Sequence, residues 1–442
     1  MRVVDDVQDP LELAPFRGIR YASPDARALI NSPELDVARA LAPPYDVVDA
    51  VSAGHLLRGG PRNAVRLTVP PAAHALTGLT GPDRYRRAAT TLRTWIESGT
   101  LVRDRFPSLY VYEQLLPGGE RQRGLIGALR LPGPGARSVR AHEEVFAESV
   151  ADRALLMTEA RANLEPVFLL YQGGRGNQRG AAALAAEAEP PAVPLVDTTT
   201  DDGVTHRLWA ITDTPQLFEI AADLAPRNAL IADGHHRYAA YQQMHAANPT
   251  ARAWGYGLAL LVNSDTSPPH VGAIHRVIAG LDCRSAARAA GTAAKVDDLG
   301  GCSIDAASAR LADAAERGPA LLLADARHRY LVRDIDRDRL AALLPKRSPR
   351  WRALPTAALI GIFLPMWKVR DEDAELVHDN AAEAARSAVP GERTAVLLPA
   401  LSVDDVYAVT AGGELTPRKS TSFGPKPRTG LVLRSLDPPD TP

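Results

Sequence analysis

The sequence lacks the features that would assign it to a disulfide-stapled, membrane-spanning or nucleic-acid-binding class. Its two cysteines, Cys283 and Cys302, are too few for a disulfide framework and do not have metal-site spacing. The longest nearly apolar stretch, residues 357–367, is well short of the roughly 20 residues that cross a bilayer. The 51 basic and 52 acidic residues leave a net charge of −1. We therefore expect no membrane partner and disfavour a nucleic-acid partner.

An export signal is also missing from the sequence. Asp5, Asp6 and Asp9 occur where a signal peptide needs a basic start and an apolar run. Together with the sparse cysteine, this pattern predicts a soluble, cytoplasmic protein. The 442 residues exceed the roughly 250–300 at which one hydrophobic core stops growing. We therefore expect two domains, residues 1–280 and 281–442, because the pattern shifts near 280 to alanine-rich helices alternating with short apolar strands.

Hydrophobic periodicity predicts helices alternating with strands. Apolar alternation over 65–69 predicts a strand, and helical spacing over 85–97 predicts a helix that ends before a glycine. Strand-like runs over 108–114 and 123–131 flank a proline–glycine turn, which is a hairpin signal. The expected fold class is α/β, of the α+β type with a mixed sheet.

The strongest local signal is the segment Asp233–Arg237, which reads Asp-Gly-His-His-Arg. It follows a predicted buried strand over 228–231 and precedes a predicted helix over 238–247. A glycine there lets a ligand approach the N–H groups of the first helical turn, where the helix dipole favours negative charge. Arg237 can add a bidentate contact to phosphate. The segment therefore predicts a phosphate-binding turn lining a polar cleft.

Two interpretations of this segment compete. Asp233 could simply cap the helix while His235 and His236 pack locally. Five consecutive residues of functional type directly after a buried strand favour a site instead. In that interpretation the Asp233 carboxylate holds a magnesium ion or accepts a proton.

A second charged cluster comprises His142, Glu143 and Glu144, followed by Asp152 and Arg153. A carboxylate beside charged neighbours can be tuned for proton transfer, so this cluster could supply a general base and a cation. A solvated charged face explains the same pattern equally well. The sequence alone leaves both interpretations open.

The segment Pro417–Pro427 combines cations and hydroxyls with prolines that stiffen the backbone. We expect Lys419, Ser420, Thr421 and Lys426 to contact phosphate by folding back onto the histidine turn. A solvated basic loop is the alternative interpretation.

Two other sites are disfavoured. The glycines of 173–180 follow a strand but do not match G-x-G-x-x-G, and no G-K-[ST] motif occurs. A zinc site from His142, His235, His236 and His378 is also disfavoured, because adjacent histidines cannot easily both face one metal and no H-E-x-x-H spacing is present.

The order and spacing of several short segments resemble the domain-of-unknown-function family DUF1015. The resemblance spans nearly the whole chain, and a family of unknown function names no reaction. The matching segments are Pro43–Val47, Tyr112–Gln114, Gly124–Gly127, His142–Glu143, Asp152–Arg153, Ile231–Arg237, His275–Arg276 and Pro417–Lys426.

A narrower resemblance concerns the Asp-Gly-His-His-Arg turn. It looks like the phosphate-binding turn of the ParB and sulfiredoxin superfamily, and most of all like that of free-serine kinases. The resemblance implies a ParB/sulfiredoxin-like nucleotide-binding core with additional N- and C-terminal α/β elaboration. It also implies that Gly234, His235, His236 and Arg237 bind phosphate and that Asp233 helps with magnesium or the nucleophile.

The free-serine kinases use an upstream glutamate as base, for which Glu143 and Glu113 are the candidates here. We assign catalysis to Asp233, His235, His236 and Glu143. Substrate binding is assigned to four residues elsewhere in the chain, Tyr45, Asp46, His142 and Arg153.

The leading hypothesis is a kinase that uses ATP or ADP with Mg²⁺ to phosphorylate a small hydroxylated metabolite such as free serine. Such a reaction asks mainly for positioning and charge neutralisation. One alternative is a ParB-like nucleotide switch or DNA-associated module, against which the near-zero net charge and the lack of a helix-turn-helix pattern count. A phosphate-ester or nucleotide hydrolase is another alternative, in which water replaces the acceptor.

Overall fold

The chain forms two compact units. The computed structural model describes residues 9–22, 35–69, 71–78, 81–133, 135–173, 180–188 and 193–437. The first unit combines Met1–Pro269 with Pro425–Pro442, and the second is His270–Gly424. We predicted one division near 280, whereas the chain passes between the units twice, after Pro269 and after Gly424. The acidic start before Asp9 and most of the glycine-rich segment 173–180 lie outside the described residues.

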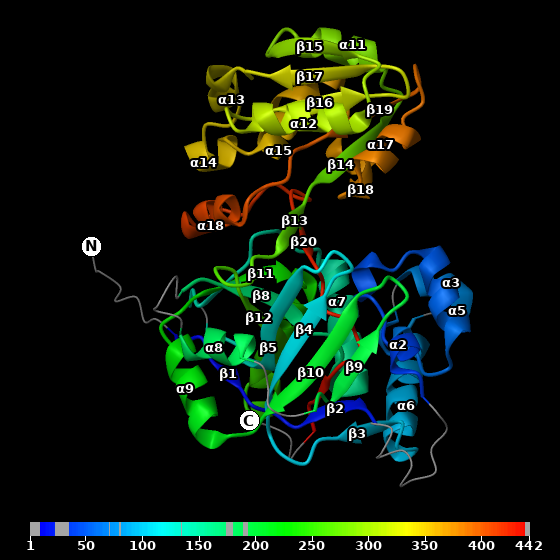
Figure 1. Cartoon of the computed structure of the whole chain (residues 1–442), viewed down its shortest axis with the longest axis vertical. Helices are drawn as coiled ribbons and strands as arrows, with labels where there is room; N and C mark the ends of the chain where they lie inside the picture. The colour runs from blue at the N-terminus through cyan, green and yellow to red at the C-terminus, as the bar shows by residue number, and fades with distance from the viewer. Residues whose placement is uncertain are drawn as a thin grey trace. The chain divides into compact units, whose positions relative to one another are not determined.

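The first unit is built on a nine-stranded sheet. Its strands have the order β6-β11-β8-β12-β5-β4-β10-β9, with β1 paired to β5. Figure 1 labels all of these strands except β6. The pairs β11–β6 and β12–β8 are parallel and the others are antiparallel, so the predicted mixed α/β class is confirmed. These strands are β1 (Leu13–Ala14), β4 (Leu109–Leu115), β5 (Arg121–Arg130), β6 (Val139–Arg140), β8 (Val167–Tyr171), β9 (Val196–Thr199), β10 (Thr205–Ile211), β11 (Ala229–Asp233) and β12 (Tyr256–Asn263).

Short helices and a smaller sheet complete this unit. The smaller sheet has the order β3-β2-β21-β7, from β3 (Leu101–Arg103), β2 (Gly18–Tyr21), β21 (Leu433–Ser435) and β7 (Ala162–Asn163). No helix among the described residues is both long and apolar enough to cross a membrane. The helices, with 3-10 turns marked η, are α2 (Val37–Ala40), η1 (Tyr45–Val47), α3 (Ala50–Gly59), α4 (Val65–Thr68), η2 (Pro71–Ala73), α5 (His74–Thr77), α6 (Asp83–Glu97), α7 (Ala147–Ala160), α8 (Ala181–Glu187), α9 (Thr214–Leu224), α10 (His235–Ala247) and η4 (Arg252–Gly255).

One face of the large sheet packs against helices α7 to α10. Side chains alternate along each strand, so Val167, Leu169 and Tyr171 of β8 share this face. They join Ile231 of β11 and residues such as Met157 of α7 in one buried apolar cluster. This packing fixes the start of α10 against the end of β11, where the predicted site lies.

The predicted hairpin and helix are confirmed, and one predicted strand is wrong. β4 and β5 pair antiparallel, and α6 covers the predicted helix. Residues 65–68 form helix α4 instead of a strand, and Val69 is its C-cap residue. The amide side chain of Asn63 accepts a hydrogen bond from Val65 N at 2.9 Å, and Thr68 N donates to Ala64 O. Such local caps initiate a helical turn, which here still buries the alternating Val65 and Leu67.

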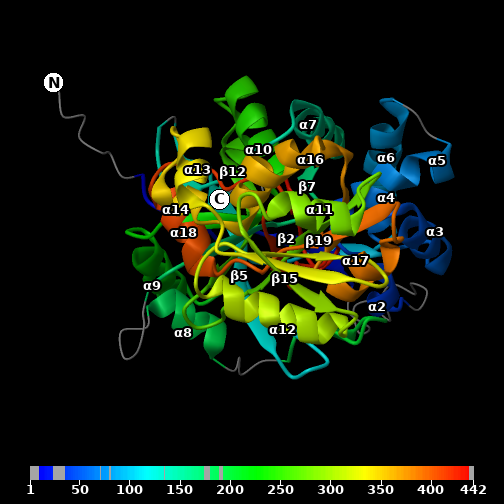
Figure 2. The ribbon, with the colours of Figure 1, turned by 90° about the horizontal axis from the view of Figure 1, so that it is seen from above.

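The second unit is a sandwich of three layers. Its six-stranded sheet has the order β15-β17-β16-β19-β14-β18 with all pairs antiparallel, and β13 pairs with β20. Figure 2 shows α11 and α16 on one side of the sheet and α12 on the other, in agreement with two separate apolar clusters.

The strands of this unit are β13 (His270–Gly272), β14 (Ile274–Ala279), β15 (Lys295–Gly300), β16 (Leu321–Ala324), β17 (Arg329–Arg333), β18 (Glu375–His378), β19 (Arg393–Leu397) and β20 (Ser422–Gly424). Its helical segments are α11 (Cys283–Ala290), α12 (Ile304–Ala315), α13 (Arg337–Leu343), α14 (Pro349–Arg352), α15 (Pro355–Ala358), the π-helical η5 (Leu359–Phe363), α16 (Leu364–Trp367), η6 (Asp371–Asp373), α17 (Ala381–Ser387) and α18 (Val403–Ala411).

Candidate functional site

The segment Asp233–Arg237 forms the predicted turn from strand into helix. Strand β11 ends at Asp233, Gly234 adopts a left-handed conformation with φ of 91°, and α10 begins at the next residue. Glycine adopts this conformation without the penalty that a side chain brings. A Cβ on Gly234 would also lie 3.0 Å from Arg237 Nε. The N-cap position of α10 is Gly234, which has no side chain with which to cap the first turn.

Arg237 is buried in a network of polar groups. Its Nη2 donates to Asp233 Oδ2 at 2.5 Å, and its Nη1 donates to the carbonyl oxygen of Pro166 at 2.6 Å. The guanidinium also lies 5.9 Å from the centre of the Tyr45 ring. Burial opposes the charge of Arg237, but Glu165 and Asp233 outweigh burial and raise the pKa of Arg237. The sequence assigned this side chain to phosphate, whereas its terminal nitrogens hold the turn together.

Lys426 joins two carboxylates beside the turn. Its ammonium pairs with Asp233 Oδ1 and lies 3.4 Å from Asp46 Oδ2. The backbone is fixed nearby, because Gln114 Nε2 donates to the carbonyl oxygen of Lys426 at 3.0 Å. Burial lowers the pKa of Lys426, but the two carboxylates outweigh burial and raise it above its ordinary value. Lys426 is therefore a charged group at the start of α10.

Two histidines meet at this point with defined tautomers. His142 Nδ1 lies 2.6 Å from the carbonyl oxygen of Ile231, which can only accept, so Nδ1 carries a proton. The backbone N–H of His142 donates to His235 Nε2 at 3.4 Å, so Nε2 of His235 is unprotonated. The two rings meet edge to face with centres 4.5 Å apart. Burial lowers the pKa of both histidines, which keeps both neutral at pH 7.

Glu143 and His236 flank this pair. Glu143 Oε1 lies 3.9 Å from His142 Nε2 and accepts no hydrogen bond among the described residues. The side chain of Glu143 is only 17% exposed. The ring of His236 stacks on Phe146 with centres 5.8 Å apart. A carboxylate and an imidazole thus lie on either side of the His142–His235 contact.

The loop that carries Tyr45 and Asp46 is attached to the same site. Tyr45 N donates to Glu165 Oε1 at 2.9 Å, and Thr429 Oγ1 donates to the same oxygen at 2.9 Å. Arg153 lies over the Tyr45 ring, 4.0 Å from its centre. Burial raises the pKa of Glu165, against the opposing effect of the nearby arginines.

Arg153 is itself held in place by other groups. Its Nε donates to Asp152 Oδ2 at 2.8 Å, and its Nη1 donates to Thr68 O at 2.7 Å. Arg84 and Tyr85 bond the other oxygen of Asp152, each at 2.6 Å. The ion pair with Asp152 therefore fixes Arg153 against the ring of Tyr45.

Sequence reasoning missed Glu165, which ties the Tyr45 loop to Thr429. Its signal is slight, a lone carboxylate between Leu164 and Pro166 just before the buried strand β8. The contacts described above involve the predicted site residues Tyr45, Asp46, His142, Glu143, Arg153, Asp233, Gly234, His235, Arg237 and Lys426, whereas His236 stacks on Phe146.

The other members of the predicted phosphate-binding run belong to the second unit. Lys419 has a φ of 53°, and its carbonyl oxygen accepts a hydrogen bond from Arg276 Nη1 at 2.8 Å. Ser420 Oγ donates to Pro417 O at 2.5 Å, and both Ser420 and Thr421 are buried. The Ser420 side chain therefore serves the local turn.

Glu113, the other base considered, has different partners. On β4 it pairs with Arg123 at 2.5 Å and with Arg207 at 3.1 Å, and it is buried. Both of its oxygens are thus paired with arginines.

The metal question concerns Asp233. Among the residues described, no group of three or more His, Cys, Asp or Glu side chains has an arrangement suited to a metal ion. Asp233 and Asp46 nevertheless converge on one cation, the ammonium of Lys426. Two carboxylates are enough for Mg²⁺ when phosphate oxygens and water complete its shell.

The chain belongs to a family defined by sequence. A family model described as "Protein of unknown function (DUF1015)" matches residues 13–357, as the resemblance of its short segments predicted. This chain is a member of that family. Among curated proteins, none matches the sequence significantly.

Several solved structures resemble the chain at low similarity. SbnI with a C-terminal truncation, from Staphylococcus aureus, is 8% identical with a TM-score of 0.35 over 69% of this chain and 85% of that one. A free serine kinase variant in complex with ADP is 12% identical with a TM-score of 0.33 over 66% and 88%. A conserved hypothetical protein from Pyrococcus furiosus is 11% identical with a TM-score of 0.31 over 67% and 90%. At this level of similarity they assign no reaction to the chain.

Proposed function

We propose that the first unit is a phosphotransferase that binds ATP or ADP at Asp233–Arg237 and phosphorylates the hydroxyl of a small metabolite such as free serine. One observation carries the proposal: α10 begins after Gly234, an N-cap residue without a side chain, and a lysine ammonium and neutral imidazoles lie at the same turn. Helix N–H groups and a nearby cation are the groups that bind phosphate.

The phosphates would lie against the first turn of α10. Gly234 lets them approach the backbone, and the 13-residue helix directs the positive end of its dipole toward them. The ammonium of Lys426 and the ring of His236 would contact the terminal phosphate. In this arrangement Arg237 positions Asp233 and the turn, because both of its terminal nitrogens already have protein partners.

Asp233, which shares Lys426 with Asp46, would hold a magnesium ion together with the phosphates. When bound, the ion would neutralise charge on the phosphate oxygens. Because Lys426 now pairs with both carboxylates, its ammonium would shift toward the phosphates. The Asp233 carboxylate would then pair with the magnesium ion, and the ammonium of Lys426 would pair with the phosphates.

Glu143 is the proposed proton acceptor. The acceptor's hydroxyl oxygen would attack the terminal phosphorus, forming the new P–O bond while the bond to the leaving nucleotide breaks. The hydroxyl proton would pass to Glu143, whose Oε1 accepts no hydrogen bond among the described residues. His142 does not compete for this proton by donating to Glu143, since its single ring proton is on Nδ1 and is committed to Ile231 O.

The acceptor would bind near the Tyr45–Asp46 loop. The Asp46 carboxylate, 3.4 Å from Lys426, would pair with the ammonium of an amino acid. Tyr45 is held between Arg153 and Glu165, so its ring forms a fixed wall. Arg153 would act through Tyr45, because its own donors are engaged.

The test is to incubate the protein with Mg²⁺, ATP or ADP, and a panel of amino acids and sugars, and to detect products by mass spectrometry. We expect one phosphorylated acceptor, formed at least about a hundredfold more slowly by Glu143→Gln, since general-base catalysis contributes that much. The exposed neighbour provides the control, so Glu144→Gln keeps the full rate. Release of inorganic phosphate without an acceptor would identify a hydrolase, and nucleotide binding without turnover would favour the switch alternative.

A further inference from the structure

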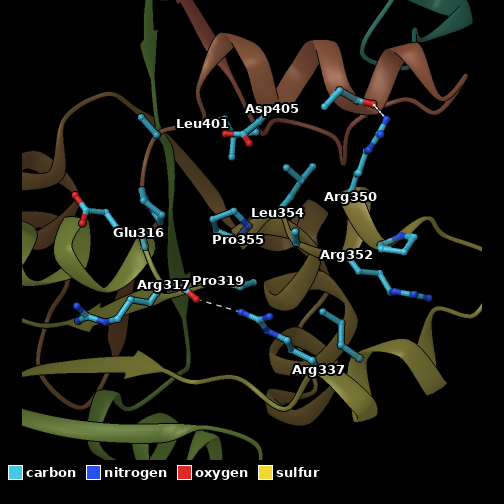
Figure 3. Close-up of a pocket in the computed structure, with 18 of the residues that line it drawn as sticks. Glu316, Arg317, Pro319, Arg337, Arg350, Arg352, Leu354, Pro355, Leu401 and Asp405 are labelled. Carbon is cyan, nitrogen blue, oxygen red and sulfur yellow. Dashed lines mark hydrogen bonds between the residues drawn. The ribbon is translucent and has the colours of Figure 1, made fainter.

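The second unit contains a pocket that the proposed phosphotransferase reaction does not use. Its volume is about 620 Å³, within the range of sites that bind small molecules. Its walls come from α13, α14, α18 and the turns that follow α12 and β19 (Figure 3). All of these elements belong to the same unit.

Four arginines line the pocket. Among the described residues, no carboxylate lies within ion-pair distance of Arg317, Arg337, Arg350 or Arg352. Arg317 does help to lower the pKa of the Asp334 carboxyl at longer range. The pocket therefore carries an excess of positive charge.

The pocket has two acidic residues, and one of them is already committed. Asp405 Oδ2 accepts hydrogen bonds from Ser402 N at 2.9 Å and Ser402 Oγ at 2.7 Å in the capping box of α18. Glu316 is exposed at the end of α12. Both carboxylates keep their negative charge, so the four arginines leave an excess of two positive charges among the residues that line the pocket.

Two of the arginines are oriented across the pocket. Arg337 Nη2 donates to the carbonyl oxygen of Arg317 at 3.1 Å, and Arg350 Nη1 donates to the carbonyl oxygen of Ala408 at 3.4 Å. Figure 3 shows Arg337 and Arg350 at opposite ends of the pocket, with Arg317 and Arg352 directed outward. A guanidinium has five N–H groups, so each retains donors for a ligand.

Apolar side chains lie between these two arginines. Leu340, Leu354, Pro355 and Leu401 are pocket residues that are buried in the surrounding core. An apolar floor binds the body of an organic molecule, and cations at the rim select its charged group.

We propose that this pocket binds an organic phosphate or phosphonate, with an apolar body on the leucine and proline floor and a dianionic head held by Arg337 or Arg350. The planar fork of arginine matches the oxygens of such a head, and the apolar surroundings strengthen the charge interaction. A pocket of this size takes a metabolite and excludes a polymer. This site is independent of the proposed reaction, because it uses other residues in the other unit.

The experiment measures binding to the full chain by isothermal calorimetry with 1-naphthylmethylphosphonate as the probe. Methylphosphonate supplies the head without the body, and 1-naphthalenemethanol supplies the body without the head. We expect saturable binding of the complete probe at one site, and at least about tenfold weaker binding of either fragment. If one fragment bound as tightly as the complete probe, the proposal that the site needs both the apolar body and the dianionic head would be wrong.

Variants locate the binding. Arg337→Gln and Arg350→Gln should each weaken the binding of the probe about tenfold or more, because both guanidiniums attract its dianionic head. Arg339→Gln, on the exposed side of the same helix α13, is the matched control and should bind normally. Ala341→Trp fills the pocket from α13 and should abolish binding without removing charge. Thermal unfolding checks that each variant is folded, and unchanged binding by Arg337→Gln and Ala341→Trp would overturn the proposal.

Discussion

At the level of single residues, the charges of the candidate site alternate in sign along a connected path. Asp46 pairs with Lys426, Lys426 with Asp233, and Asp233 with Arg237. Glu165 then stabilises the charge of Arg237. A phosphate can bind beside these residues only where a cation can pair with it, because a buried charge without a partner costs several kcal/mol. Of the two cations, Lys426 has the more exposed side chain, at 20% against 3% for Arg237.

Lys426→Ala should therefore weaken nucleotide binding. A hydrogen bond to a charged group is worth roughly 1.5–3 kcal/mol, which corresponds to a loss of about tenfold or more in affinity. Titration calorimetry with ATP and with ADP measures the effect. The exposed Lys346 offers a control, and Lys346→Ala should bind as the unaltered protein does. Equal affinities for the two variants would remove Lys426 from the phosphate site.

A second residue-scale prediction concerns pH. His206 is buried between Tyr112 and Thr200, at 2.9 and 3.0 Å, and burial lowers its pKa to about 4. The pKa of His206 in the unfolded chain is near 6.5, so between pH 6.5 and 4 the unfolded chain binds a proton that the folded protein does not. The free energy of unfolding is therefore highest above pH 6.5 and decreases as the pH falls toward 4. Between pH 7 and pH 5 the loss should be roughly 2 kcal/mol of unfolding free energy.

Urea unfolding at the two pH values tests this prediction. His206→Gln should lose less stability than the unaltered protein over the same interval, because its side chain does not titrate. His55→Gln, at an exposed position, should keep the full pH dependence. Equal slopes for His206→Gln and the unaltered protein would show that other groups cause the pH effect.

At the level of elements, the sequence predicted what local patterns determine. The strand before Asp233 and the helix after it follow from apolar periodicity, and the β4–β5 hairpin follows from its turn residues. Helix α4 escaped prediction because Asn63 sets its start through a side-chain hydrogen bond that periodicity does not register. Glu165 escaped because its partners, Tyr45 and Thr429, are far away in sequence.

The junction of β11 and α10 makes an element-scale prediction. Gly234→Ala should destabilise the protein by more than Gly119→Ala, although the two glycines have similar φ values of 91° and 87°. Both substitutions incur about 1–2 kcal/mol for left-handed backbone. Only the Cβ at Gly234 meets a buried group, Arg237 Nε at 3.0 Å, whereas nothing lies within 4 Å of a Cβ at Gly119. Urea unfolding of both variants gives the difference, and equal losses would mean that Arg237 adjusts freely.

At the level of the whole molecule, the first unit is discontinuous in sequence. Its main part ends at Pro269, and it resumes at Pro425 after the entire second unit. Sequence reasoning placed a single boundary near 280, because a local change of composition reveals where a pattern shifts but not where a chain returns. The return depends on long-range pairings such as β21 with β2 and β7.

This connectivity predicts that the second unit can be removed. Its two ends lie side by side, since His270 pairs with Gly424 in β13 and β20. A chain in which a short Gly-Ser linker replaces residues 270–424 should fold cooperatively and, under the proposed function, still bind nucleotide. Circular dichroism and calorimetry test both properties. A product without cooperative unfolding would show that the first unit needs the second to fold.

The return of the chain at Pro425 also sets an order of events during translation. Lys426, Thr429 and Arg434 leave the ribosome only after all 155 residues of the second unit, counted from His270 to Gly424. Before then, Asp233 and Asp46 have no lysine between them, and Asn163 and Tyr256 O have no Arg434 to bond. The first unit of a nascent chain therefore stays incomplete until all of the second unit has been translated. A ribosome that stalls after Gly424 would leave a protein that has most of its residues but lacks Lys426, so that its candidate site is never assembled.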